Sequence, residues 1–178
     1  MRAQRLSIIA GLVLAGTAAC APRPPFSVAV TDANDGRFAS AQYYDSQGCT
    51  GNNVPPRLIW TTPPASARSL AVTVFDPDAQ QGQGWWHWLV SDLPPETREL
   101  KPDAALPAGA LSYANSFGQA GYGGPCPPVG ETHHYVITLY ALRDAHLNVP
   151  AGATPDAVKA LLEADAITEA HTTLTAGR

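Results

Sequence analysis

The segment G-Y-G-G-P-C-P-P-V-G-E-T-H-H-Y, from Gly121 to Tyr135, joins a glycine- and proline-rich loop to the start of an apolar strand. Glycine lets a backbone approach a ligand closely and proline fixes φ, so this mixture predicts a rigid, pre-shaped wall. The loop leads directly into His133 and His134, whose rings can carry charge near neutral pH. We therefore expect the loop to bring histidine donors to a binding site at the beginning of the strand.

A second cluster places acids and an imidazole in a similar setting. V-F-D-P-D-A (74–79) ends a strand at Asp76, and W-W-H-W (85–88) follows it. Imidazolium, phenol and backbone N–H groups are the donors that an anion needs when it leaves water. We predict that the two clusters meet in space and form one small anion-binding pocket. Taken alone, Asp76 has a second interpretation as the cap of the turn that Pro77 begins.

Length and composition indicate a single globular domain, which we place at residues 26–178. The chain has 178 residues, of which 45% are hydrophobic and 15% charged, and this is enough to bury a core. The formal net charge of −4 argues against nucleic-acid binding, which requires basic patches.

Apolar runs between loops rich in glycine and proline predict a mostly β fold. Strands are expected over residues 26–30, 57–60, 69–76, 86–92, 134–142 and 167–175. The run at 69–76 is apolar on both faces, which is typical of a central strand. Thr154, Pro155 and Asp156 predict the start of a helix, and we interpret residues 96–121 as a surface excursion.

The first twenty residues have the features of an export signal. Arg2 and Arg5 precede an apolar run that is too short for a comfortable membrane span. The run ends in T-A-A-C at Cys20, which resembles the lipobox of bacterial lipoproteins, and a proline-rich tether follows at 21–25. We therefore expect an exported protein of the bacterial cell envelope or periplasm, attached to a membrane through lipid on Cys20. An ordinary signal peptide, cut close to Cys20, is the alternative.

Three cysteines fit an oxidising compartment. If Cys20 carries lipid, Cys49 and Cys126 remain as an even pair, each in a turn-rich loop. We expect these two residues to lie close together, either as a disulfide or as two free buried thiols.

Several motifs, in order, give the chain a resemblance to a known family. D-P-D-A (76–79), H-W (87–88) and G-Y-G-G-P-C-P-P-x-G-x-x-H-x-Y (121–135) resemble the phosphatidylethanolamine-binding protein (PEBP) family, in its bacterial Raf-kinase-inhibitor-like (YbhB/YbcL-type) branch. Further matches are G-N-N-V-P-P-R-L-I-W (51–60), N-S-F-G (115–118) and L-Y-A-L (139–142). The resemblance spans roughly residues 26–175. Gln80 departs from it, because the family usually continues D-P-D-A with proline.

The resemblance implies an antiparallel β-sandwich with few peripheral helices and a pocket for phosphate or another anionic head group. It assigns ligand-binding positions to Asp76, His87, Gly124, Pro125, His133 and Tyr135. Asp78 and Trp88 would support them, although a tryptophan in such a strand is more often a core or rim residue than a ligand contact.

Catalysis has little support in the sequence. It contains no H-E-x-x-H, no G-x-S-x-G and no paired carboxylates beside a plausible nucleophile. We therefore predict a non-enzymatic binding protein with no catalytic residue, metal or cofactor. An inhibitor or signalling partner of a protease or kinase, acting through the pocket mouth, is the main alternative, and a hydrolase is a weaker one. His134 should face away from His133 and lie on the surface, since strand neighbours point to opposite faces.

Overall fold

The computed structural model describes residues 25–178. The predicted signal segment, the lipidation site Cys20 and nearly all of the tether at 21–25 lie outside the described residues. Within the described part, no helix is both long enough and apolar enough to cross a membrane.

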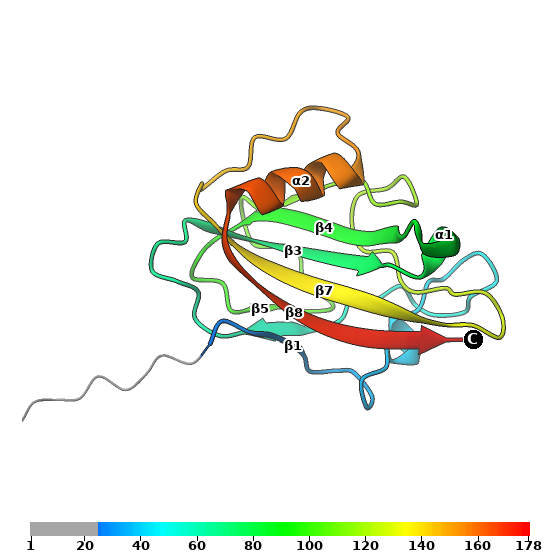
Figure 1. Ribbon diagram of the computed structural model, residues 1–178. Coiled ribbons are helices and arrows are strands. Elements are labelled where there is room, and N and C mark those ends of the chain that lie inside the picture. Colours follow the sequence, from blue (N-terminus) through cyan, green and yellow to red (C-terminus); the bar gives the residue numbers. More distant parts are fainter. Residues whose placement is uncertain (1–24) are drawn as a thin grey trace, which may run out of the picture.

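Two antiparallel sheets pack face to face and form the sandwich that the sequence predicted (Figure 1). The larger sheet has the order β6-β4-β3-β7-β8, with β6 at Leu111–Ser112, β4 at Trp85–Leu93, β3 at Ser69–Asp76, β7 at Thr132–Leu142 and β8 at Ala166–Gly177. The smaller sheet has the order β1-β2-β5, with β1 at Val28–Val30, β2 at Leu58–Trp60 and β5 at Glu99–Leu100. Strand β3 is central, as its apolar faces predicted.

Alternation along β3 divides its side chains between two cores. Leu70, Val72 and Val74 point into the space between the sheets, where they meet side chains of β2 and β5. Ala71 and Phe75 point to the opposite face, which is covered by α2 at Pro155–Asp165. Because both faces of β3 are buried, its side chains are mainly apolar on both faces, with Thr73 as a buried polar exception.

The helix α2 lies across the outer face of the large sheet (Figure 1). Its first turn forms as predicted: the Thr154 Oγ1 accepts the backbone N–H of Ala157 at 3.2 Å, and Pro155 occupies the first helical position. Asp156 then accepts a hydrogen bond from the indole N–H of Trp86 at 2.8 Å, which ties the helix to β4.

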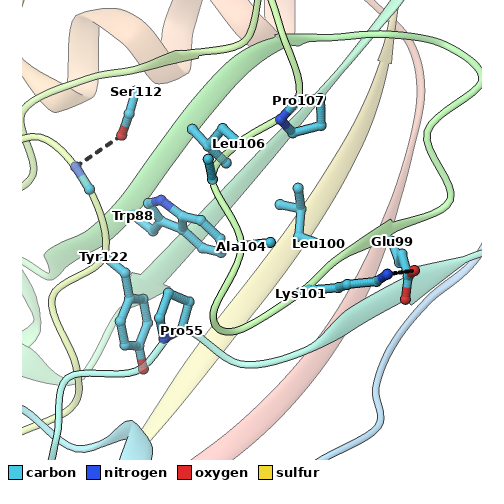
Figure 2. Close-up of a pocket in the computed structure, with 12 residues that line it drawn as sticks. Pro55, Trp88, Glu99, Leu100, Lys101, Ala104, Leu106, Pro107, Ser112 and Tyr122 are labelled. Atoms are coloured by element: carbon cyan, nitrogen blue, oxygen red, sulfur yellow. Dashed lines mark hydrogen bonds and ion pairs between the residues drawn. The ribbon is translucent and has the colours of Figure 1, made fainter.

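The interpretation of residues 96–121 as a surface excursion was only partly right. The segment supplies the short strands β5 and β6, one to each sheet, and Leu100 is buried in the inter-sheet core. Between them the chain loops over β4 and encloses a cavity bounded by Trp88, Leu106 and Tyr122 (Figure 2). Strands of two residues carry too little alternation to be recognised in a sequence. Two helical turns were also missed, η1 at Ser40–Gln42 and α1 at Ala79–Gly82.

Two asparagines hold the loop at 121–124 in place although it belongs to no strand. The Asn53 side chain accepts from the N–H of Gly124 at 2.7 Å and donates to the carbonyl of Tyr122 at 3.1 Å, as a strand partner would. Asn115 donates to the carbonyl of Gly121 at 3.0 Å. A Cβ on Gly124 would collide with the backbone carbonyl of Gln42, so this close approach requires glycine.

A disulfide joins Cys49 to Cys126, with the two Cα atoms 5.9 Å apart. This outcome confirms that the two cysteines lie together and selects the bonded alternative over two free thiols. The bond anchors the far end of the 121–126 loop, beyond the reach of the asparagines.

Replacing Cys49 and Cys126 together with serine is expected to lower the free energy of unfolding by about 2–4 kcal/mol, because the open chain regains the entropy of a long loop. The two cysteines are 77 residues apart in the sequence. Urea unfolding of the variant should match that of the wild-type protein in reductant. An unchanged unfolding midpoint in both would show that the bond adds nothing to stability.

Candidate functional site

A β-bulge directs His87 into the space between the sheets. Val74 pairs with Trp88 and Phe75 pairs with Trp86, so His87 is the extra residue on β4. Its ring packs against Tyr135 at a centroid distance of 5.1 Å. In a regular strand, His87 and its neighbour Trp88 would point to opposite faces of the sheet. Bulges commonly redirect side chains in this way beside functional sites.

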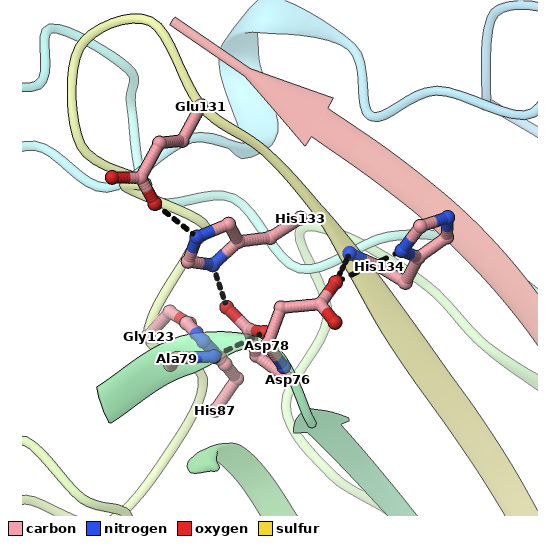
Figure 3. Close-up of polar contacts among 8 residues, drawn as sticks. All are labelled: Asp76, Asp78, Ala79, His87, Gly123, Glu131, His133 and His134. Atoms are coloured by element: carbon pink, nitrogen blue, oxygen red, sulfur yellow. Dashed lines mark hydrogen bonds and ion pairs between the residues drawn. The ribbon is translucent and has the colours of Figure 1, made fainter. Parts of the chain in front are cut away.

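The predicted meeting of the two sequence clusters is confirmed by His133 and Asp76. The Nδ1 of His133 lies 2.7 Å from Oδ2 of Asp76, and its Nε2 lies 3.0 Å from Oε2 of Glu131 (Figure 3). Both partners are carboxylates, which accept, so both ring nitrogens donate and the ring is an imidazolium. Burial opposes this charge, but the hydrogen bonds to Asp76 and then to Glu131 outweigh it and raise the pKa of His133.

Asp76 has two functions, one for each carboxylate oxygen. Its Oδ1 accepts the backbone N–H groups of Asp78 and Ala79, at 2.9 and 3.1 Å, and so caps the turn after β3. Its Oδ2 holds His133. The interpretation of Asp76 as a turn cap is confirmed, and the same turn fixes the carboxylate that orients His133.

His87 and His133 lie in one site but differ in charge. Burial lowers the pKa of His87 to about 4, against smaller opposing effects from the carbonyl of Gly123 and from Asp76. The neutral His87 ring donates its Nδ1–H to that carbonyl at 2.6 Å, which leaves Nε2 as an acceptor. Burial and then the neighbouring Asp76 raise the pKa of Tyr135, so its phenol stays protonated. The site thus combines one cationic donor, one neutral acceptor and one phenol.

These groups line a cavity of about 570 Å³ together with residues that the sequence did not single out for the site. Glu131 is the most consequential of these, and it could have been found, because it lies two residues before His133 and alternation puts both on one side. Phe117 forms an aromatic wall, stacked on Tyr44 at 4.4 Å and edge-on to Trp85 at 5.3 Å. Cys126, Gln81 and Gln83 complete the rim.

Not all of the predicted positions join this cavity. Gly124 and Pro125 form the wall behind it, with their backbone groups hydrogen-bonded to Asn53 and Tyr44. Trp88 points into the inter-sheet core and lines the separate cavity of Figure 2 rather than this one. His134 is exposed, as predicted, and its backbone N–H and Nδ1 both bond Asp78, at 2.7 and 2.9 Å.

Comparison with known proteins identifies the family. The sequence model named "Phosphatidylethanolamine-binding protein" matches residues 30–177. The chain belongs to the phosphatidylethanolamine-binding protein family. Within this family it is 36% identical to the UPF0098 protein YbcL of Escherichia coli K12, over 94% of this chain and 96% of that protein. The crystal structure of YbcL, described as a new member of the mammalian PEBP family, superposes with a TM-score of 0.80 at 35% identity, covering 86% of this chain and 98% of that one.

Two other PEBP relatives match a smaller share of this chain. The protein YbhB of E. coli K12 is 40% identical over 69% of this chain and 82% of its own length. A Mycobacterium tuberculosis H37Rv protein named "Putative lipoprotein LppC" is 44% identical over 73% of this chain, which spans about 61% of that relative.

The departure at Gln80 from the PEBP pattern has a backbone explanation. Gln80 and Gln81 adopt left-handed conformations, with φ of 52° and 59°, in the turn α1. Proline is locked near φ −65° and cannot adopt this conformation. Glutamine at position 80 therefore permits a turn that carries Gln81 and Gln83 to the rim of the cavity.

In an NMR pH titration, His133 should have a pKa above the usual value of 6.5, whereas His87 should stay neutral down to about pH 4. Because the folded-state pKa of His133 is raised, its stabilising effect is complete below the unfolded pKa and disappears as pH rises through the folded one. The free energy of unfolding should therefore fall over that interval.

Replacing Glu131 with glutamine should lower the pKa of His133, since one of its two carboxylate partners loses its charge. Glu169→Gln is a matched control, because Glu169 contacts His171 two residues away on exposed β8 at 3.1 Å. If Glu131→Gln and Glu169→Gln changed the pKa of His133 equally, the contact between Glu131 and His133 would be contradicted.

Proposed function

We propose that this protein is a non-enzymatic binding protein whose cavity takes a phosphate or phospholipid-like head group at His133. The family carries the general expectation of an anionic ligand. The observation that supports a specific mode is the pair of carboxylates on His133. One of them, Asp76, is buried and fixed by its turn, whereas the side chain of Glu131 is 58% exposed.

Glu131 occupies the position that a ligand oxygen would take. It gives the outer nitrogen of His133 a carboxylate partner at 3.0 Å, and a phosphate oxygen would form the same charge-assisted hydrogen bond. An exposed ion pair of this kind stabilises the protein little, so its exchange for a ligand costs little. Binding is then a competition in which the anion replaces Glu131 while Asp76 keeps the ring oriented.

The remaining charges define which anion fits. Asp76, Asp78 and Glu131 give the cavity three carboxylates against the cation of His133. A highly charged anion would be repelled, so we propose that singly charged phosphate groups bind best. The acceptor on His87 would accommodate a ligand O–H or N–H, and the wall of Phe117 would contact an apolar portion.

We further propose that the protein functions in the cell envelope, attached to a membrane through Cys20. The disulfide between Cys49 and Cys126 supports an oxidising compartment. The name of the mycobacterial relative, "Putative lipoprotein LppC", agrees with a lipid anchor.

Calorimetric titration with glycerophosphoethanolamine tests the head-group proposal, because its phosphodiester charge does not change between pH 6 and pH 8. Binding should be present at pH 6, weaken at pH 8 as His133 loses its proton, and disappear in His133→Ala. Phosphate and phosphoethanolamine are titrated for comparison, because their phosphate groups can take a second negative charge. Absence of heat at both pH values would refute the head-group proposal and favour a protein partner at the mouth.

Glu131→Gln should bind the same ligand about twofold to tenfold more tightly at pH 6, because the competing carboxylate is removed while Asp76 still holds the charged ring. Glu169→Gln should bind like the wild-type protein. Weaker binding by the Glu131 variant would instead make Glu131 part of the ligand contact and contradict the competition.

A further inference from the structure

The cavity under the 101–110 loop is separate from the head-group site. It has a volume of about 380 Å³, within the range of small-molecule pockets. Its lining is mainly apolar and includes Trp88, Leu100, Leu106, Pro55, Pro107 and Tyr122 (Figure 2). None of these residues lines the cavity that contains His133.

The indole N–H of Trp88 is the unusual group in this cavity. Trp60 and Trp86 donate to Thr97 and Asp156, both at 2.8 Å, and the nitrogen of Trp85 is sealed from solvent without a partner. Within residues 25–178 the Trp88 N–H also has no protein acceptor, but unlike the Trp85 nitrogen it is not sealed from solvent. The Trp88 side chain is otherwise buried, with 4% of the residue exposed, so its N–H has access only to the cavity that the ring lines.

The other polar groups around the cavity are already engaged. The hydroxyl of Tyr122 donates to the carbonyl of Gln42 at 3.0 Å, and that of Ser112 accepts the N–H of Gly121 at 2.9 Å. At the rim, Glu99 is held between Lys101 at 3.1 Å and Arg57 at 2.8 Å, so its charge is compensated. The cavity therefore offers the Trp88 N–H as a side-chain donor between mainly apolar walls, and at its rim Lys101 and Arg57 share the single carboxylate of Glu99.

We propose that this cavity is a second ligand site, for a small uncharged apolar molecule that carries one hydrogen-bond acceptor. The acceptor, such as a ketone or ester carbonyl, accepts a hydrogen bond from the Trp88 N–H. Buried tryptophan N–H groups normally have such an acceptor. The apolar body fills the space between the rings of Trp88 and Tyr122 and the side chains of Leu100 and Leu106. A charged acid fits less well, because its carboxylate would leave water for mainly apolar walls and the rim cation Lys101 is already paired with Glu99.

The four tryptophans give four indole N–H signals in a ¹⁵N-correlated NMR spectrum, and the Trp88→Phe variant assigns the relevant one. Acetophenone should move the Trp88 indole proton downfield on binding. Ethylbenzene, which lacks the acceptor, should bind about threefold to tenfold more weakly without this shift. In Trp88→Phe, the affinity for acetophenone should fall to that for ethylbenzene. The wild-type protein should bind benzoate no more tightly than acetophenone or ethylbenzene.

Leu106→Trp fills the cavity and should abolish binding, whereas Val129→Trp adds an indole at a residue that lines neither cavity and should leave binding unchanged. Unaltered signals of Trp60, Trp85 and Trp86 confirm that each variant is folded. The proposal is overturned if saturating acetophenone leaves the Trp88 signal in place. It is equally overturned if ethylbenzene produces the same shift, or if binding persists in Leu106→Trp.

Discussion

The hydrogen bond between Asp76 and His133 is the contact on which the site depends. It joins the end of β3 to the start of β7 and buries a charged pair at the edge of the inter-sheet core, with only 3% and 8% of the two side chains exposed. Removing one member of such a pair leaves the other buried without its partner, which costs far more than the pair itself contributes. The position of the imidazolium is therefore fixed before any ligand arrives.

The surrounding carboxylates compensate the charge of this fixed imidazolium. Glu131 lies directly before β7, within reach of the outer nitrogen, and gives the ring a second carboxylate. His87 stays neutral because it is buried deeper and has only a carbonyl as hydrogen-bond partner. Two histidines that are close in space thus differ in charge for a local physical reason. One has carboxylates within hydrogen-bond distance and the other does not.

Much of this arrangement could be predicted from the sequence. The double-faced apolar run of β3 and the capped start of α2 follow from residue patterns that depend on neighbours along the chain. The proximity of Cys49 and Cys126 was expected from the number of cysteines, whereas the bond itself was one of two alternatives. The bulge at His87 could not be predicted from the sequence, because an extra residue is defined only against the partner strand. The bulge also explains why the neighbours His87 and Trp88 both point inward yet line different cavities. The charge of His133 also depends on Glu131, whose contact requires the folded geometry.

The bulge and the loop at 121–124 together separate the two cavities. His87 and Trp88, adjacent in the chain, face one cavity each, and the loop passes between them. Gly121 and Tyr122 contact the Trp88 cavity, whereas the carbonyl of Gly123 holds His87. A single loop segment can form this wall because Asn53 and Asn115 hydrogen-bond its backbone groups and its glycines allow close approach. The asparagine motifs at 51–60 and 115–118 therefore act on both cavities, because they fix the wall that the two share.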